Sequence, residues 1–196
     1  MLDRFLEALT GRRVGGALFV LGGLVVAAAV LTARGNDSPP KPRIQPTRLV
    51  SVPQLGLAFA HPRAWKRTVS GQVIRLRSPD RSSVMTFASP VSGRQPARVK
   101  RALRVALLDR LKPAKILRDG PAKLGRQEAS TFELRGTGPK RRVTRALVFV
   151  AGTRFRTYAV TLLTPARPSA KRLAEAQQIL ATVSLSQPRT LRKKKR

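Results

Sequence analysis

The stretch that decides the fold is residues 127–164, QEASTFELRGTGPKRRVTRALVFVAGTRFRTYAVTLLT. Three runs within it, 127–135, 143–150 and 154–164, are rich in β-branched and aromatic residues, which favour strands. Two groups of turn formers separate these runs, Gly136-Thr137-Gly138-Pro139 and Ala151-Gly152-Thr153. The stretch therefore predicts three antiparallel strands joined by hairpin turns.

Shorter strands are predicted before this meander. Short apolar runs lie at 49–52, 57–60 and 115–117. Val73–Arg77 leads into a turn, Ser78-Pro79-Asp80-Arg81, and the alternating run Ser83–Ala88 follows. This is the pattern of a strand, a turn and a second strand.

A helix is predicted on either side of the meander. Apolar residues recur at helical spacing in Pro96–Lys112, and Pro113 ends this helix. Ser169 is an N-cap for a second helix to Ala181, which a short strand at 183–185 follows. The order predicts an α+β domain, an antiparallel sheet with helices packed on it. We expect one shared core to contain Leu57, Phe59, Trp65, Leu103, Phe149, Tyr158 and Leu180.

The N-terminal part of the chain predicts a membrane segment. Val14–Ala33 holds 20 residues without a charge. A helix of that length is roughly 30 Å long, which is enough to cross the hydrocarbon core of a bilayer. Arg12 and Arg13 precede the segment and only Arg34 adjoins its other end, which favours residues 1–13 in the cytoplasm and the bulk of the chain outside. A cleaved signal peptide is the alternative, because the basic start fits both.

Two segments flank the predicted folded domain, 49–187. Residues 34–48 contain four Pro and no periodic apolar pattern, which predicts an extended linker. Residues 188–196 end in five consecutive cations, 192–196. Because these charges repel one another and the segment offers little to bury, we expect a basic disordered tail.

The chain is strongly basic. It carries 40 Lys and Arg against 9 Asp and Glu, a formal net charge of +31. Between Leu49 and Gln187 there are 27 basic and 6 acidic residues, so the predicted domain is basic as well as the tail. A charge this far from zero attracts polyanions. Genome composition is an alternative source, because Arg is accompanied by other residues with GC-rich codons.

No motif in the sequence points to catalysis. The chain has no Cys and a single His, which removes thiolate metal sites, thiol nucleophiles and nearly all Ser-His-Asp chemistry. No two of the six acidic residues in 49–187 are spaced for acid–base work, and no phosphate-binding Gly loop occurs. We expect a protein that is not an enzyme and that holds neither a cofactor nor a metal. His61 is expected to have a structural role, and Trp65 to cap the edge of the core.

Two short motifs resemble PsbP-like domains. Leu57-Ala58-Phe59-Ala60-His61-Pro62 with Trp65 is similar to the opening of that family, and Leu124–Ala129 to its "G-x-x-A" segment. The family includes the photosystem subunit PsbP, Ran-binding import factors and extracytoplasmic lipoproteins. Here His61 stands where Tyr is common, and an apolar segment stands where many relatives carry a lipid-modified Cys. The resemblance implies an α/β/α sandwich over 49–187 and a binding role without particular catalytic residues.

The sequence thus predicts a single-pass membrane protein that presents a binding or assembly module outside the cell membrane, in the cell envelope. Its partners are expected to be anionic lipid, polymer or protein. One alternative is a membrane-tethered nucleic-acid binder that faces the cytoplasm, which the scarcity of aromatic residues disfavours. The other is a secreted binding protein, if the apolar segment is cleaved. The predicted anion-binding residues are Arg98, Arg101, Arg104, Arg141, Arg142, Arg192, Lys193, Lys194, Lys195 and Arg196.

Overall fold

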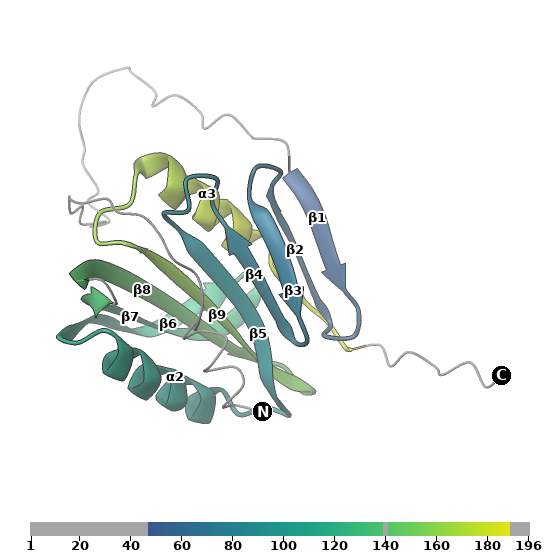
Figure 1. Ribbon diagram of the computed structural model, residues 1–196. Helices are drawn as coiled ribbons and strands as arrows, with labels where there is room; N and C mark the ends of the chain where they lie inside the picture. The colour runs from purple at the N-terminus through teal and green to yellow at the C-terminus, as the bar shows by residue number, and fades with distance from the viewer. Residues whose placement is uncertain (1–46, 139–140, 189–196) are drawn as a thin grey trace, which may run out of the picture.

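A computed structural model of the chain describes residues 47–138 and 141–188 (Figure 1). They form a seven-stranded antiparallel sheet, a three-stranded sheet and two helices. The large sheet has the order β3-β4-β5-β9-β8-β7-β6. Its strands are β3 (Lys66–Ser70), β4 (Val73–Arg77), β5 (Val84–Ser92), β6 (Ala114–Leu124), β7 (Gln127–Gly138), β8 (Arg142–Gly152) and β9 (Arg156–Pro165).

The predicted meander is present as β7, β8 and β9, and it forms the middle of the large sheet. Thr131 pairs with Phe149, which pairs in turn with Val160. β7 runs further than predicted, through Gly136 and Gly138. A Cβ atom on Gly136 would lie 2.4 Å from the carbonyl oxygen of Leu111, so this glycine allows a close approach to the end of the first helix instead of forming a turn.

The two faces of the large sheet bury two separate cores. Because side chains alternate across a strand, neighbours in sequence point to opposite faces. Val148 of β8 and Phe132 of β7 belong to the core under α2 (Pro96–Arg110). Val160 of β9 and Phe87 of β5 belong to the other core, beneath α3 (Ala170–Ala181) and the small sheet. Figure 1 shows α2 on one face and α3 on the opposite one.

The small sheet has the order β1-β2-β10 and is built from β1 (Thr47–Val52), β2 (Leu57–Pro62) and β10 (Ser184–Leu185). Its middle strand places Leu57 and Phe59 in the core, where the Phe59 ring stacks on Phe87 with centroids 4.1 Å apart. Thr182, the residue after α3, accepts a 2.9 Å hydrogen bond from the backbone N–H of Ala60. This contact ties the end of α3 to the small sheet.

A polar network fixes α3 on its side of the sheet. Glu175 is 4% exposed, and its Oε2 accepts hydrogen bonds from the Trp65 indole at 2.8 Å and from Arg172 at 2.6 Å. Arg172 also donates to Asp80 at 2.9 Å. Asp80 further accepts hydrogen bonds from Ser78 and Ser82. The network therefore joins the β4–β5 turn, α3 and the residue that precedes β3.

Three expectations from the sequence are wrong or incomplete. The predicted single core is divided, because Leu103 lies under α2 whereas Trp65 and Tyr158 lie on the other face, with Phe149 and Leu180 partly buried beside them. β3 was not predicted, since all five of its residues are exposed and show no alternation. β6 extends to Leu124 instead of ending at 117.

Several predicted segments lie outside the described residues. These are residues 1–13, the apolar segment 14–33, nearly all of the linker 34–48, and the tail from Arg189 onward. Within 47–138 and 141–188, no helix combines the length and the apolar character needed to cross a bilayer.

Candidate functional site

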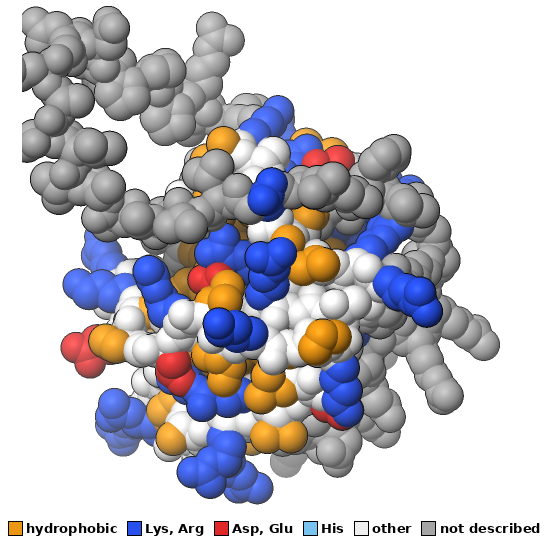
Figure 2. Space-filling view, turned by 90° about the vertical axis from the view of Figure 1, so that its left-hand side faces the viewer, with side chains coloured by type: hydrophobic (Ala, Val, Ile, Leu, Met, Phe, Trp, Pro, Cys, Tyr) orange, Lys and Arg blue, Asp and Glu red, His pale blue; other side chains and the backbone are white. Residues whose placement is uncertain are grey.

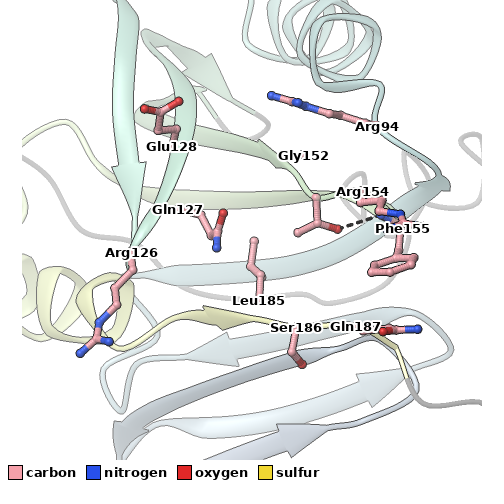
Figure 3. A pocket seen from close by; sticks show the side chains of 11 residues that line it. Arg94, Arg126, Gln127, Glu128, Gly152, Arg154, Phe155, Leu185, Ser186 and Gln187 are labelled. Carbon is pink, nitrogen blue, oxygen red and sulfur yellow. Dashed lines mark hydrogen bonds between the residues drawn. The ribbon is translucent and has the colours of Figure 1, made fainter.

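Three turns at one end of the large sheet meet beside β10, the last strand of the described part of the chain (Figure 3). Together they form a cavity of about 480 Å³, which we call the cleft. The loop before α2, the β6–β7 turn and the β8–β9 turn each contribute one arginine, Arg94, Arg126 and Arg154. The residues after β10 complete the rim. The lining residues are Arg94, Arg126, Gln127, Glu128, Gly152, Thr153, Arg154, Phe155, Leu185, Ser186 and Gln187.

Arg94 is held in place through its two neighbours in sequence. The backbone N–H of Gly93 donates to the carbonyl of Phe155 at 2.7 Å. Thr157 Oγ1 donates to the carbonyl of Gly93 at 2.8 Å and accepts from the N–H of Gln95 at 2.7 Å. Since Thr157 is fully buried, the backbone that carries Arg94 is fastened to the start of β9.

Arg126 follows a glycine that the fold requires. Gly125 has a φ of +58°, which L-residues rarely adopt, and a Cβ atom there would lie 1.8 Å from the carbonyl oxygen of Val183. Its N–H donates to the carbonyl of Leu180 at 3.1 Å. The β6–β7 turn is therefore packed against the end of α3, which explains why a glycine is needed at position 125.

The third turn presents a cation and an aromatic ring together. Thr153 closes this turn, because its Oγ1 accepts hydrogen bonds from the N–H groups of Phe155 and Arg156 at 3.3 and 3.1 Å. The Arg154 guanidinium lies 5.5 Å from the centroid of the Phe155 ring. The Phe155 side chain is 38% exposed, so the pair offers a flat and partly apolar surface beside the cleft.

A second hollow, of about 370 Å³, adjoins the cleft. Both are lined by Arg94, Glu128 and Gly152. The second hollow extends between the start of α2 and β6, and it is also lined by Lys100 and Pro121. Burial, and then the neighbouring Arg104, lower the pKa of the Lys100 ammonium, which is paired with Asp119.

The side chains that line the cleft are suited to bind an anion. Three arginines and a single carboxylate, Glu128, line it together with Gln, Ser and Thr side chains that donate and accept hydrogen bonds. Arginine is suited to carboxylate and phosphate groups, because its planar fork donates several hydrogen bonds. Within the described part of the chain, no three His, Asp or Glu side chains come together in a way that could hold a metal ion.

The anion-binding residues predicted from the sequence do not line the cleft. Arg98 and Arg101 are exposed on α2, and Arg98 donates to Gln95 at 3.2 Å. Arg104 is turned inward, where it pairs with Asp119 and lies over the Phe132 ring at 5.6 Å.

Arg141 and Arg142 lie toward the other end of the large sheet. β8 begins at Arg142, which pairs with Gly138, and Gly138 lies close to Leu111 at the end of α2. β8 ends at Gly152, which lies close to Arg94, just before the start of α2. The two arginines and the cleft are therefore at opposite ends of β8. The tail residues Arg192, Lys193, Lys194, Lys195 and Arg196 lie outside the described residues.

Basic side chains are not confined to the cleft. Figure 2 views the end of the molecule opposite the cleft, where many Lys and Arg side chains alternate with apolar ones and few acidic ones. The cleft therefore stands out by its shape and by its converging turns, not by being the one basic region.

The two residues singled out by the family resemblance are both buried. His61 is 2% exposed, its Nδ1 lies 2.9 Å from the carbonyl oxygen of Pro62, and its Nε2 has no hydrogen-bond partner. Burial is the main cause that lowers its pKa, and Arg67 and Arg48 lower it further. Trp65 is 2% exposed and joins the core. Neither side chain lines the cleft or the second hollow.

No family of known proteins and no curated protein matches this sequence. Among solved structures, one from Bacteroides thetaiotaomicron VPI-5482 matches with a TM-score of 0.51 and 16% identity. The match covers 71% of this chain and 48% of the other, so this chain spans about half the length of that protein.

Two further matches are proteins of known name. Cyanobacterial PsbP from Synechocystis sp. PCC 6803 matches with a TM-score of 0.49 and 15% identity, over 77% of this chain and 99% of the other. LpqN of Mycobacterium tuberculosis, described as involved in cell envelope biogenesis, matches with a TM-score of 0.47 and 12% identity, over 72% and 91%. The α+β architecture predicted from the sequence, an antiparallel sheet with helices packed on it, is confirmed, and both of these matches belong to the PsbP-like proteins that the sequence resembles. At these identities the likeness concerns the fold alone.

Proposed function

We propose that this protein is a membrane-tethered, extracytoplasmic binding module of the cell envelope, which recognises an anionic partner through the cleft and performs no catalysis. The observation that carries the proposal is that Arg94, Arg126 and Arg154, which come from three separate turns, all line one cavity. The apolar segment 14–33 and the Pro-rich residues that follow it are the sequence features that support a tether.

The cleft offers binding groups and lacks a catalytic arrangement. Its single acid, Glu128, is exposed, and the lone His of the chain is buried elsewhere. General acid–base chemistry needs a group with a suitable pKa within hydrogen-bond reach of a reacting atom. Arginines that surround a cavity supply affinity and orientation for an anion instead.

Binding is tested by removing two of the three arginines. The full-length protein carrying Arg94→Ala and Arg126→Ala should lose at least tenfold in affinity for its anionic partner, estimated from the free energy of charged hydrogen bonds, about 1.5–3 kcal/mol each. The matched control carries Arg67→Ala and Arg167→Ala, which remove the same charge from exposed positions outside the cleft. Equal losses in both variants would show that overall charge, and not the cleft, holds the partner.

Location is tested by cysteine labelling, because the natural chain has no Cys. Ser70→Cys lies at the exposed end of β3 and should react with an impermeant thiol reagent in intact cells. Leu9→Cys, in the predicted cytoplasmic segment, should react only after lysis. The opposite pattern would favour the nucleic-acid binder that faces the cytoplasm.

A further inference from the structure

The shape of the cleft indicates a ligand longer than a single anion. The cleft and the second hollow share Arg94, Glu128 and Gly152, so the two adjoin, and a ligand that contacts both must be an extended one. Figure 3 shows the Arg126 and Arg94 side chains on different sides of Gln127, with Arg154 further along the rim. The guanidinium groups therefore do not close around one point, as they would around an isolated phosphate or carboxylate.

The charge pattern of the cleft favours anions that are spaced apart. Glu128, like Arg94, lines both hollows. A polymer with a charge on every short unit, such as polyphosphate, would place negative charge next to this carboxylate, and like charges at short range repel. A polymeric ligand whose carboxylates are separated by neutral groups avoids this repulsion. Its carboxylates can lie at the arginines while a neutral group lies at Glu128.

The neutral lining has the chemistry that sugars require. Gln127 and Gln187 present amides that both donate and accept hydrogen bonds, as sugar hydroxyls do. The exposed Phe155 ring, with Arg154 against it, provides a flat apolar surface for the C–H face of a pyranose.

From these three observations we infer that the cleft and the second hollow together bind a segment of an acidic polysaccharide, a chain of sugars that carries spaced carboxylates. This inference deepens the proposed function and rests on it. A bilayer surface fits the site less well, because its headgroups offer no pyranose face to the Phe155 ring.

The test compares three probes on the full-length protein in detergent at one ionic strength. Oligogalacturonate should bind more tightly than polyphosphate of equal total charge, and more tightly than phosphatidylglycerol presented in mixed micelles. Arg94→Ala and Arg126→Ala should each weaken oligogalacturonate binding about tenfold. Arg67→Ala, outside the cleft, should change it less than twofold, and circular dichroism should show that all variants keep the fold.

Two variants separate the ligand class from the presence of a site. Glu128→Gln should strengthen polyphosphate binding more than oligogalacturonate binding, because it removes the repulsion of closely spaced charges. Phe155→Ala should weaken oligogalacturonate binding and leave polyphosphate binding unchanged.

The possible failures are distinguishable. If polyphosphate or phosphatidylglycerol binds more tightly than oligogalacturonate and depends on Arg94 and Arg126, the cleft is an anion site but the polysaccharide inference is overturned. If binding of every probe is independent of these two arginines, the proposed function of the cleft fails as well.

Discussion

The two helices cover opposite faces of one sheet but are held there by different interactions. α2 buries Val99, Leu103 and Leu107, and its charged partners Lys100 and Arg104 bond to Asp119 at the edge. α3 instead buries a carboxylate, Glu175, whose hydrogen bonds fix where the helix lies. The burial of apolar side chains stabilises a helix on a sheet but does not depend on its exact orientation. A buried carboxylate does depend on it, because any shift of the helix that separates the carboxylate from its hydrogen-bond donors destabilises the protein. The face under α3 is therefore specified more narrowly than the face under α2.

The largest expected effect is on the α3 side. Trp65→Ala should lower the free energy of unfolding by about 3–5 kcal/mol, because a buried ring is lost and Glu175 loses a donor. Urea unfolding followed by circular dichroism measures the change. Trp65→Phe keeps most of the ring and should cost less than Trp65→Ala. A cost below about 1 kcal/mol for Trp65→Ala would contradict a polar anchor for α3.

The matching test on the other face is Leu103→Ala. Leu103 is 1% exposed beneath α2, so we expect a loss of about 2–4 kcal/mol from transfer and cavity formation. Val105→Ala, on the exposed side of the same helix, is the control and should change stability by less than about 0.5 kcal/mol. If Leu103→Ala costs more than Trp65→Ala in the same assay, the comparison between the two faces is reversed.

A smaller effect on the α3 side is a dependence of stability on pH, which comes from Asp80. Burial by itself raises the pKa of the Asp80 carboxyl, but hydrogen bonds from Ser78, Arg172 and Ser82 outweigh it and hold that pKa well below its ordinary value. A lowered pKa in the folded state stabilises the protein above the unfolded value of about 4, and this stability is lost as the pH falls below it.

Asp80→Asn should therefore be less stable than the natural protein by about 1 kcal/mol at pH 7, since the carboxylate is partly exposed and screened. The difference should shrink as the pH falls below about 4. Asp109→Asn, which removes an exposed carboxylate on α2, is the control and should leave this pH dependence unchanged. If the difference in the free energy of unfolding between the two proteins is the same at pH 7 and pH 3, the charge of Asp80 does not contribute to holding α3.

The smallest expected effect concerns His61. Because its pKa is lowered by burial, the folded state disfavours the imidazolium, and stability falls as the pH drops below about 6.5. His61→Phe should remove the loss between pH 6.5 and 5 in thermal unfolding. A natural protein with flat stability over that range would show that His61 is protonated without cost.

The elements that could be predicted from sequence are those with a strong internal pattern. α2 and α3 have apolar residues at helical spacing and clear ends, and the meander alternates strands with turns. β3 has no such pattern, because it is an exposed edge strand that depends on pairing with β4. The bond between Trp65 and Glu175 joins residues 110 positions apart, and no local pattern encodes it.

The cleft shows the same limit. The sequence drew attention to the dense arginines of α2, whereas the arginines that line the cavity are single residues in three turns. A weak signal was present, because Arg94 and Arg126 each follow a glycine directly and Arg154 follows Gly152 by two positions. Glycine followed by arginine in a turn marks an exposed cation on a fixed backbone, but only the fold brings the three turns together.

The place of β1 gives the domain a mechanical property. β1 is an edge strand and the first described element, so any pull on the chain ahead of it enters through six residue pairs with β2. A pull along the strand loads these pairs together, whereas a pull across it opens them one by one from Thr47. β2 also pairs with β10, and the chain that leaves β10 forms the rim of the cleft at Ser186 and Gln187. If the proposed tether and the proposed ligand are both present, tension on the first and binding of the second would reach the same strand, β2.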